Sequence, residues 1–215
     1  MEGTKSSLSR VAVAIIIILL FHAVGLAGFF MGAVRPLFLR IVPFHLLLML
    51  LVILYSYGKP DNKFLLFALL IYSIGYIAEW LGVHKSWVFG NYGYGHTLGI
   101  KVSDIPLTMG VNWFLLVYAV GVTMRYIRMG WWPARVVMGS ALLVLLDLLI
   151  EPIAQRFDYW HWAADVVPLK NYIGWFTVSA VCLALFEVFK IKKLNLAAVV
   201  LLIVQFVFFG LLQLV

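Results

Sequence analysis

Hydrophobic and polar positions along this chain are grouped into long apolar runs separated by short polar segments. Seven runs are long enough for a helix of about 20 residues, which crosses a hydrocarbon layer about 30 Å thick. The runs cover approximately 11–33, 37–57, 64–83, 104–127, 132–154, 172–190 and 194–214. Pro36, Pro60 and Pro133 lie beside run boundaries, as expected for a residue that interrupts helical hydrogen bonding. The pattern predicts an all-α fold, a polytopic membrane bundle with about seven transmembrane helices.

Composition supports the same class of protein. Hydrophobic residues occupy 65% of the 215 positions and charged residues only 12%, and the mean hydropathy is +1.05. Such a chain is too apolar for a water-soluble domain. The sequence has no evident internal repeat or low-complexity linker, so residues 1–215 are expected to form a single integral-membrane domain. Lys5 and Arg10 precede the first run as in a signal peptide, but its length and the lack of a clear cleavage site predict a retained helix.

The net charge of +7 comes from basic residues in short loops, which indicates membrane topology and not nucleic-acid binding. With the amino terminus inside, ten Lys and Arg residues fall on the inner side, and these are Lys5, Arg10, Lys59, Lys63, Arg125, Arg128, Arg135, Lys190, Lys192 and Lys193. Six fall outside, and these are Arg35, Arg40, Lys85, Lys101, Arg156 and Lys170. The excess predicts a cytoplasmic amino terminus. The two long loops, about 84–103 and 155–171, then share the outer membrane face.

The stretch from Glu79 to Trp113 differs from the apolar sequence around it. It reads EWLGVHKSWVFGNYGYGHTLGIKVSDIPLTMGVNW, a segment rich in Gly, Tyr and Trp that returns to apolar sequence through Asp104 and Asn112. A polar stretch between bilayer-length apolar runs is costly unless it lines a cavity or a surface. We therefore interpret it as part of a site.

Acidic and amide residues gather beside the predicted outer face. Glu79 ends the third run and Asp104 begins the fourth, Asp147 and Glu151 end the fifth, and Asn171 opens the sixth. Because consecutive helices run antiparallel, all five are expected at a similar depth. Asp147 and Glu151 are four residues apart, which puts them on one helical face with Cβ atoms about 5–6 Å apart. Two such acids in apolar sequence rarely both stay ionised, so the pair indicates a carboxylic acid that is protonated at neutral pH.

Several of these acids also fit ordinary structural roles. Asp104 could cap the fourth helix, and Glu151 could face interfacial water. Glu187, close to Lys190, fits a pairing or interfacial role. Asp147 lies within ALLVLLDLLIEP, and its position favours function because intramembrane carboxylates are usually functional.

Aromatic residues lie near many of the predicted helix ends, where an aromatic belt at the lipid headgroups is the ordinary expectation. The tryptophans of this kind are Trp80, Trp87, Trp131, Trp132, Trp160 and Trp162. A belt explains less well the cluster of Phe89, Tyr92 and Tyr94 between glycines, or the run DYWHW at 158–162. Aromatic walls of this kind suit a polyene, and ring faces stabilise a carbocation through cation–π attraction.

Metal ligation is not indicated by the sequence. His84 and His96 share one loop and His161 lies in the other, without the compact spacing of metal ligands. The single cysteine, Cys182, lies in apolar sequence and forms no disulfide within the chain.

Three blocks of the chain resemble a known family. In order and spacing, the stretch at 79–113, DLLIEPIAQRFDYWHW and VPLKNYIGWF resemble signature blocks of the integral-membrane carotenoid biosynthesis proteins, a family of carotenoid 1,2-hydratase and bisanhydrobacterioruberin hydratase type. The resemblance covers roughly residues 75–178. The chain departs at Val88-Phe89-Gly90, where the family often has Pro-Phe-Gly, and at Glu151-Pro152, where it often has Asp-Pro.

The resemblance implies a hydro-lyase that adds water across the terminal 1,2 (isopropylidene) double bond of an acyclic carotenoid, giving a tertiary alcohol. This acid catalysis needs a protonated carboxylic acid in a dry pocket, surroundings that stabilise a tertiary cation, and a group that orients water and takes its proton. It needs no cofactor. The catalytic candidates are Asp147, Glu151, Glu79 and Asp104. The substrate-binding candidates are Tyr92, Tyr94, Asn112, Trp113, Asn171 and Trp175.

Other functions fit some of the same features. Buried carboxylates also serve proton-coupled transporters and could occur in a lipid- or carotenoid-binding membrane protein. A carotene cyclase starts from the same protonation. A retinal photoreceptor is disfavoured because the last run, LAAVVLLIVQFVFFGLLQLV, has no Lys for a Schiff base. The expected partners are an acyclic carotenoid, water and the lipid bilayer of a bacterial or archaeal inner (plasma) membrane, with association with other carotenoid-pathway membrane enzymes left open.

Overall fold

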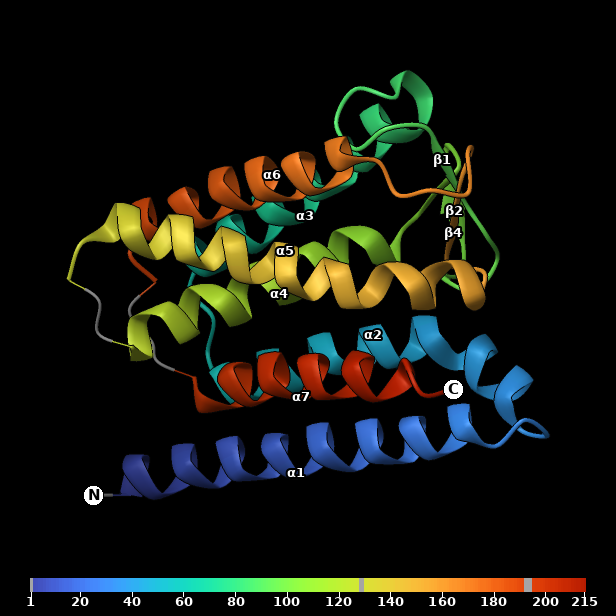
Figure 1. The fold of residues 1–215 in the computed structure, drawn as a ribbon. Coiled ribbons are helices and arrows are strands. Elements are labelled where there is room, and N and C mark those ends of the chain that lie inside the picture. Colours follow the sequence, from blue (N-terminus) through green and yellow to red (C-terminus); the bar gives the residue numbers. More distant parts are fainter. Residues whose placement is uncertain (1, 128–129, 192–194) are drawn as a thin grey trace.

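The computed structural model describes residues 2–127, 130–191 and 195–215, with side chains from residue 9 onward. All seven apolar runs form helices, which confirms the all-α fold. They are α1 (Glu2–Phe30), α2 (Arg35–Tyr57), α3 (Asn62–Lys85), α4 (Thr108–Tyr126), α5 (Trp132–Arg156), α6 (Leu169–Val188) and α7 (Leu196–Leu212). The helices lie side by side in one bundle (Figure 1). Of the basic residues counted for topology, Arg128, Lys192, Lys193 and the side chain of Lys5 lie outside the described residues.

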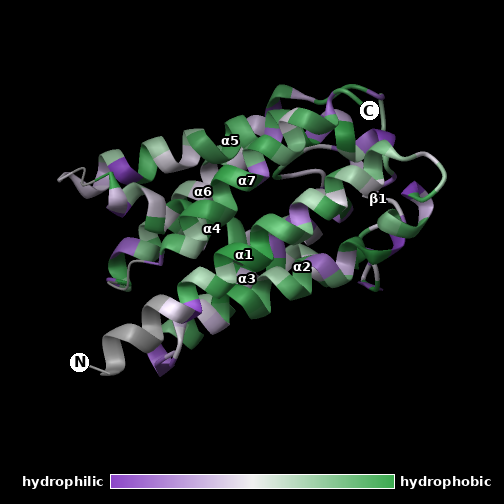
Figure 2. Cartoon of the chain, turned by 90° about the horizontal axis from the view of Figure 1, so that it is seen from below, coloured by the Kyte–Doolittle hydropathy of each residue, from purple (hydrophilic) through white to green (hydrophobic). Residues whose placement is uncertain are grey.

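Among the described residues, five helices are long and apolar enough to cross a membrane: α1 from Ser9 onward, α2, α3, α5 and α6. The apolar α7 is shorter, with 17 residues. The 19-residue α4 is buried along nearly its whole length and contacts α2, α3, α5, α6 and α7. A helix enclosed by other helices needs less hydrophobicity than one facing lipid. Figure 2 shows hydrophobic residues along the helices and hydrophilic ones mostly at their ends and in the loops.

The two long loops are joined by a small sheet at one end of the bundle (Figure 1). Strand β1 (Tyr92–Tyr94) pairs antiparallel with β4 (Trp160–Trp162), with Tyr92 opposite Trp162 and Tyr94 opposite Trp160. The expectation that both loops lie at the same end is confirmed. The strands themselves were not predicted, because runs of three residues carry too little pattern to be recognised.

A second short ribbon corrects the interpretation of Asp104. Strands β2 (Lys101–Val102) and β3 (Ile105–Pro106) form a hairpin, and Asp104 lies in its turn with φ 63°. Helix α4 begins four residues later, at Thr108, so Asp104 does not cap it. Asp and Asn accept left-handed backbone more readily than most residues, which explains the residue type without a helix start.

At the opposite end of the bundle, Glu187 on α6 forms ion pairs with two arginines. Its carboxylate lies 3.2 Å from Arg125 Nη2 on α4 and 2.8 Å from Arg135 Nε on α5. The prediction of a pairing role is confirmed, although the partners are these arginines and not Lys190. The pairs connect three helices at the end of the bundle far from the two long loops.

Candidate active site

Glu79, near the end of α3, is 3% exposed and accepts hydrogen bonds from three side chains. The hydroxyls of Tyr92 and Tyr94 donate to its Oε2 at 2.5 and 2.6 Å. The indole Nε1 of Trp113 on α4 donates to its Oε1 at 2.8 Å. Donors of this kind favour the ionised form of Glu79, whereas its burial disfavours that form.

Two glycines of α3 let these donors approach Glu79. A Cβ at Gly75 would lie 2.3 Å from Cγ of Trp113, and one at Gly82 would lie 2.6 Å from the hydroxyl oxygen of Tyr92. Both separations are far shorter than the optimal contact of about 3.5–4.0 Å between carbon atoms. A larger residue at either position would therefore displace a donor from Glu79.

Glu151 on α5 is 2% exposed and also accepts three N–H groups. The indoles of Trp162 and Trp160 donate to its Oε2 at 2.8 and 3.1 Å. The side-chain amide of Asn171 on α6 donates to its Oε1 at 3.0 Å. Trp160 and Trp162 are thus buried donors and not members of a headgroup belt, and sequence reasoning did not include them among the site residues.

The β1–β4 ribbon explains how four aromatic residues reach the two acids. Alternate residues of a strand point to the same face, so Tyr92, Tyr94, Trp160 and Trp162 share one face of the ribbon. All four donate to Glu79 or Glu151. The patterns YGY and WHW, each with an aromatic residue at alternate positions, were the signal in the sequence for this arrangement.

Asp147, one turn before Glu151, is completely buried. Its Oδ2 accepts a hydrogen bond of 2.7 Å from Nδ2 of Asn171, the same nitrogen that donates to Glu151. Within the described part of the chain, Oδ1 of Asp147 has no hydrogen-bond partner. Asp147 therefore receives one donor where Glu79 and Glu151 each receive three.

The three acids lie in an apolar interior, and in the described residues their hydrogen bonds come only from Tyr, Trp and Asn. The described part of the chain contains no group of three or more His, Cys, Asp or Glu side chains that could hold a metal ion. Buried charges without counter-ions are costly. At least one of the acids is therefore expected to carry a proton, and Asp147 has the fewest donors to stabilise an anion.

The two tyrosines of β1 lie outside the helices and keep their protons. Burial, together with the charge of Glu79, raises the pKa of Tyr92 and Tyr94 well above the ordinary value for tyrosine. Both hydroxyls consequently remain available as donors to Glu79 over the whole physiological pH range.

A small cavity of about 10 Å³ is lined by both Glu79 and Glu151. Its other lining residues are Phe89, Tyr92, Tyr94, Met109, Trp160, Trp162, Asn171 and Trp175. The volume is close to the minimum for one water molecule, and the polar lining provides the two to four hydrogen-bond partners that such a water needs. Asp147 does not line this cavity. It is connected to it by Asn171, which lines the cavity and donates to both Asp147 and Glu151.

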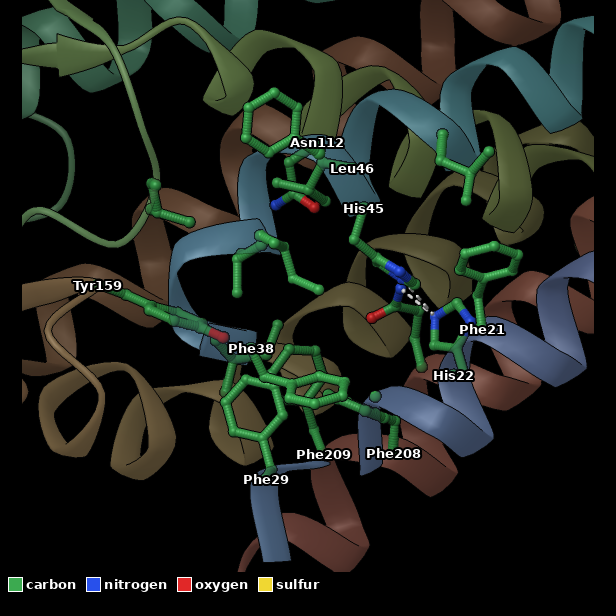
Figure 3. A pocket seen from close by; sticks show the side chains of 18 of the residues that line it. Phe21, His22, Phe29, Phe38, His45, Leu46, Asn112, Tyr159, Phe208 and Phe209 are labelled. Atoms are coloured by element: carbon green, nitrogen blue, oxygen red, sulfur yellow. Dashed lines mark hydrogen bonds between the residues drawn. The ribbon is translucent and has the colours of Figure 1, made fainter. Parts of the chain in front are cut away.

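A larger chamber of about 450 Å³ (Figure 3) shares part of its wall with the small cavity. Its walls come from α1, α2, α4, α5, α6 and α7 and from the loops, and Figure 3 shows Phe29, Phe38, Phe208 and Phe209 around it. Met109, Trp160 and Trp175 line both the chamber and the small cavity. An apolar ligand in the chamber would therefore be next to the acids.

Most of the predicted site residues come together. They form two hydrogen-bonded groups that meet at the small cavity, Glu79 with Tyr92, Tyr94 and Trp113, and Asp147 with Glu151 and Asn171, and Trp175 lies in the wall of both cavities. Asn112 lines the chamber and not the small cavity. Asp104 is the exception: its side chain is 80% exposed and lies 3.4 Å from Nε2 of His84. Asp104 therefore does not join the buried acids, because the hairpin carries it to the surface of the protein.

Comparison with known proteins identifies a matching family and a similar protein. The family described as carotenoid biosynthesis protein matches residues 40–215. Bisanhydrobacterioruberin hydratase from Haloarcula japonica is 31% identical over 129 residues, which is 57% of this chain and 43% of that protein. The chain thus aligns with less than half the length of this relative. No solved structure matches the chain.

Proposed function

The chain belongs to the carotenoid biosynthesis protein family, and we propose that it is a carotenoid hydratase. It adds water across the terminal 1,2 double bond of an acyclic carotenoid end group and gives a tertiary alcohol. The observation that carries the proposal is the pair of carboxylic acids, Glu79 and Glu151, that line one water-sized cavity beside an aromatic chamber. The relative named as a hydratase supports the reaction class.

The reaction needs a proton, a stabilised cation and a water molecule. Protonation of the alkene at C2 forms a C–H bond and leaves a tertiary cation at C1. Water then forms a C–O bond at C1, and the resulting oxonium loses a proton to a base. The sum is one alkene plus one water, with no overall oxidation, so the residues must supply only acid, base and orientation.

In this mechanism, Asp147 and Glu151 together act as the general acid. Glu151 contacts the cavity, but its two oxygens are occupied by three N–H donors. Asp147, with its unpartnered Oδ1, is the group best suited to hold the proton. We assign Asp147 as the proton store and Glu151 as the group that passes the proton to the alkene.

In the same mechanism, Glu79 acts as the general base. Three donors hold it as a carboxylate, and it lines the same cavity as Glu151. A water between the two acids would be oriented by Glu79 with the Tyr92 and Tyr94 hydroxyls, and would lose its proton to Glu79 as the C–O bond forms. Proton transfer by positioned groups of this kind contributes about 10²- to 10⁴-fold to a rate.

Aromatic faces support the cation. Trp160 and Trp175 line both cavities, and Phe89 and Trp162 line the small one. Cation–π attraction is strongest where the cation is desolvated, as in this buried site. The reacting end group lies in the chamber against Trp160 and Trp175, and the remainder of the polyene extends toward lipid.

The membrane arrangement belongs to the same proposal. We infer that α4 and α7 cross the membrane with the five longer apolar helices, because α4 packs at the centre of the bundle and α7 consists almost wholly of apolar residues. The amino terminus then faces the cytoplasm and the acid cluster lies near the outer face. The carotenoid enters from the bilayer.

Expression in a bacterial host that accumulates lycopene tests the activity. The expected product has the mass of lycopene plus one water and an unchanged visible spectrum, since hydration leaves the conjugated chromophore intact. A cyclase would give an isomer without added mass, and a transporter would leave the pigment unchanged. Unaltered pigments with lycopene and with other acyclic carotenes would contradict the proposal.

A further inference from the structure

The chamber and the small cavity share three wall residues: Met109 at the start of α4, Trp160 on β4 and Trp175 on α6. Glu79 and Glu151 line the small cavity but not the chamber. A polyene end group in the chamber is therefore separated from both acids by the shared wall. In the proposed function, on which this inference rests, C1 and C2 of the end group must meet a water molecule and an acid, so part of this wall has to move.

Both indoles of the shared wall are held in place. Trp160 donates Nε1 to Glu151 at 3.1 Å, so its displacement would remove a donor from a buried acid. The ring of Trp175 stacks on that of Trp113, with ring centroids 4.6 Å apart. Trp113 is fixed in turn by its hydrogen bond of 2.8 Å to Glu79. Moving Trp175 would lose the stacking energy of a buried aromatic pair.

Met109 is the shared wall residue that is free to change its rotamer. It is 2% exposed, and its side chain makes no hydrogen bond within the described part of the chain. The helix around it is fixed, because Thr108 Oγ1 donates to the carbonyl oxygen of Leu98 at 2.7 Å and a Cβ at Gly110 would lie 2.6 Å from Cδ2 of Tyr72. Methionine is unbranched and has three rotatable bonds, so its side chain can move while α4 stays in place.

We propose that Met109 is the gate between the chamber and the small cavity. In this structure its side chain forms part of the partition between the apolar chamber and the water-sized cavity. When the end group of the polyene arrives, the side chain moves aside, and the terminal double bond meets the water and Glu151. Met109 thereby contacts the reacting end group and controls its access to the acids.

Two substitutions separate a gate from a residue that only fills space. Isoleucine has a similar volume, but its branch at Cβ leaves one strongly preferred χ1 rotamer in a helix. We expect Met109→Ile to lower kcat roughly tenfold, which corresponds to about 1.4 kcal/mol in the barrier. Met109→Ala removes the partition and should turn over faster than Met109→Ile, although a cavity in the core makes it the less stable variant. A residue that only fills space predicts the opposite order of activities.

Product formation in membranes containing lycopene gives kcat, and quenching of tryptophan fluorescence in the detergent-solubilised full-length protein gives the affinity for lycopene. Met109→Ile should keep the affinity of the unmodified protein. Met124→Ile is the matched control and should keep its kcat, since Met124 is a buried residue of α4 that lines neither cavity. Full kcat in Met109→Ile, or slower turnover in Met109→Ala than in Met109→Ile, would overturn the inference. If Met109→Ala does not fold, the comparison of Met109→Ile with Met124→Ile decides.

Nuclear magnetic resonance of methionine methyl groups labelled with carbon-13 tests the gate without turnover. The signal of Met109 is identified by its absence from Met109→Ile. The methyl carbon shift depends on the χ3 rotamer, so the shift of Met109 should change when lycopene is added, and that of Met124 should not. One unchanged Met109 rotamer in the free and the lycopene-bound protein would overturn the gate even if hydration is observed. A rotamer change without hydration would support the gate and contradict the proposed activity.

Discussion

Asn171 on α6 donates its side-chain amide to Asp147 on α5 across a distance of 2.7 Å. The bond ties two helices together through a completely buried acid. The same nitrogen donates to Glu151, which has two indole donors besides, whereas Asp147 has none. This difference in donors is the reason to assign the proton to Asp147 and to treat the pair as one acid.

Asp147→Asn is expected to abolish most of the activity. An amide of the same size preserves packing but holds no transferable proton, and loss of a general acid reduces a rate by about 10²- to 10⁴-fold. Product formation in membranes containing lycopene measures the effect, with tryptophan fluorescence as the folding check. Asp104→Asn is the matched control, because this exposed residue lies in a left-handed turn that Asn also adopts. Full activity in Asp147→Asn would move the acid role to Glu79 or Glu151.

Trp162→Phe is expected to lower turnover roughly tenfold while leaving the fold intact. The change removes an N–H that donates to Glu151 at 2.8 Å, and an unsatisfied buried acceptor costs about 1–3 kcal/mol. Trp87→Phe, at a position that is 66% exposed, is the control and should behave like the unmodified protein. Equal turnover in the two variants would indicate that the indole of Trp162 only fills space.

Gly75→Ala is expected to destabilise the protein by about 1–3 kcal/mol, as overpacking in a core does. The added Cβ would lie 2.3 Å from Trp113, so relaxation must move the indole that donates to Glu79. Thermal unfolding in detergent measures stability, and hydration measures the effect on Glu79. At Gly210 a Cβ meets nothing within 4 Å, so Gly210→Ala should change stability by less than about 0.5 kcal/mol. Equal melting temperatures for the two variants would contradict the packing argument.

The ribbon that carries the aromatic donors is expected to loosen in acid. Burial disfavours ionisation of Asp158, but the backbone N–H of His96 and the ring of His161 outweigh it, so the pKa of Asp158 lies below its ordinary value. A lowered folded-state pKa gives stability that is present above the unfolded value, about 3.9, and is lost as the pH falls through the folded pKa. Docking of the loop at 95–97 should therefore weaken below about pH 4.

Hydrogen exchange of residues 95–97, corrected for the intrinsic rate at each pH, measures this docking. In Asp158→Asn, protection should already be lower at neutral pH and should change little on acidification. Asp165→Asn, another exposed loop residue with positive φ, is the control and should keep the behaviour of the unmodified protein. Identical exchange in the two variants would show that Asp158 does not hold the loop.

The apolar runs predicted all seven helices because bilayer-length hydrophobicity is a local property of the sequence. The four-residue spacing of Asp147 and Glu151 likewise predicted a shared face, and the structure joins them through one amide. Asp104 was misplaced because a two-strand hairpin before α4 leaves no recognisable pattern. We expected the helix to begin where the apolar run begins, at residue 104, but it begins at Thr108.

Long-range pairing explains what the sequence did not reveal. Trp160 and Trp162, the donors to Glu151, lie on β4, which pairs with β1 more than 60 residues earlier in the chain. In the chamber wall, His22 contacts His45, which is 23 residues away in the sequence, and Gln205, which is 183 residues away. Periodicity assigns helices but not which helices become neighbours, so neither group could be assembled from the sequence.

The most direct test of the central claim is hydration of an acyclic carotene by membranes containing the protein in oxygen-18-labelled water. The account predicts that the product gains one labelled oxygen as a tertiary alcohol, and that Asp147→Asn gives almost none of it. Conversion without incorporation of labelled oxygen, or equal incorporation by membranes that lack the protein, would contradict it.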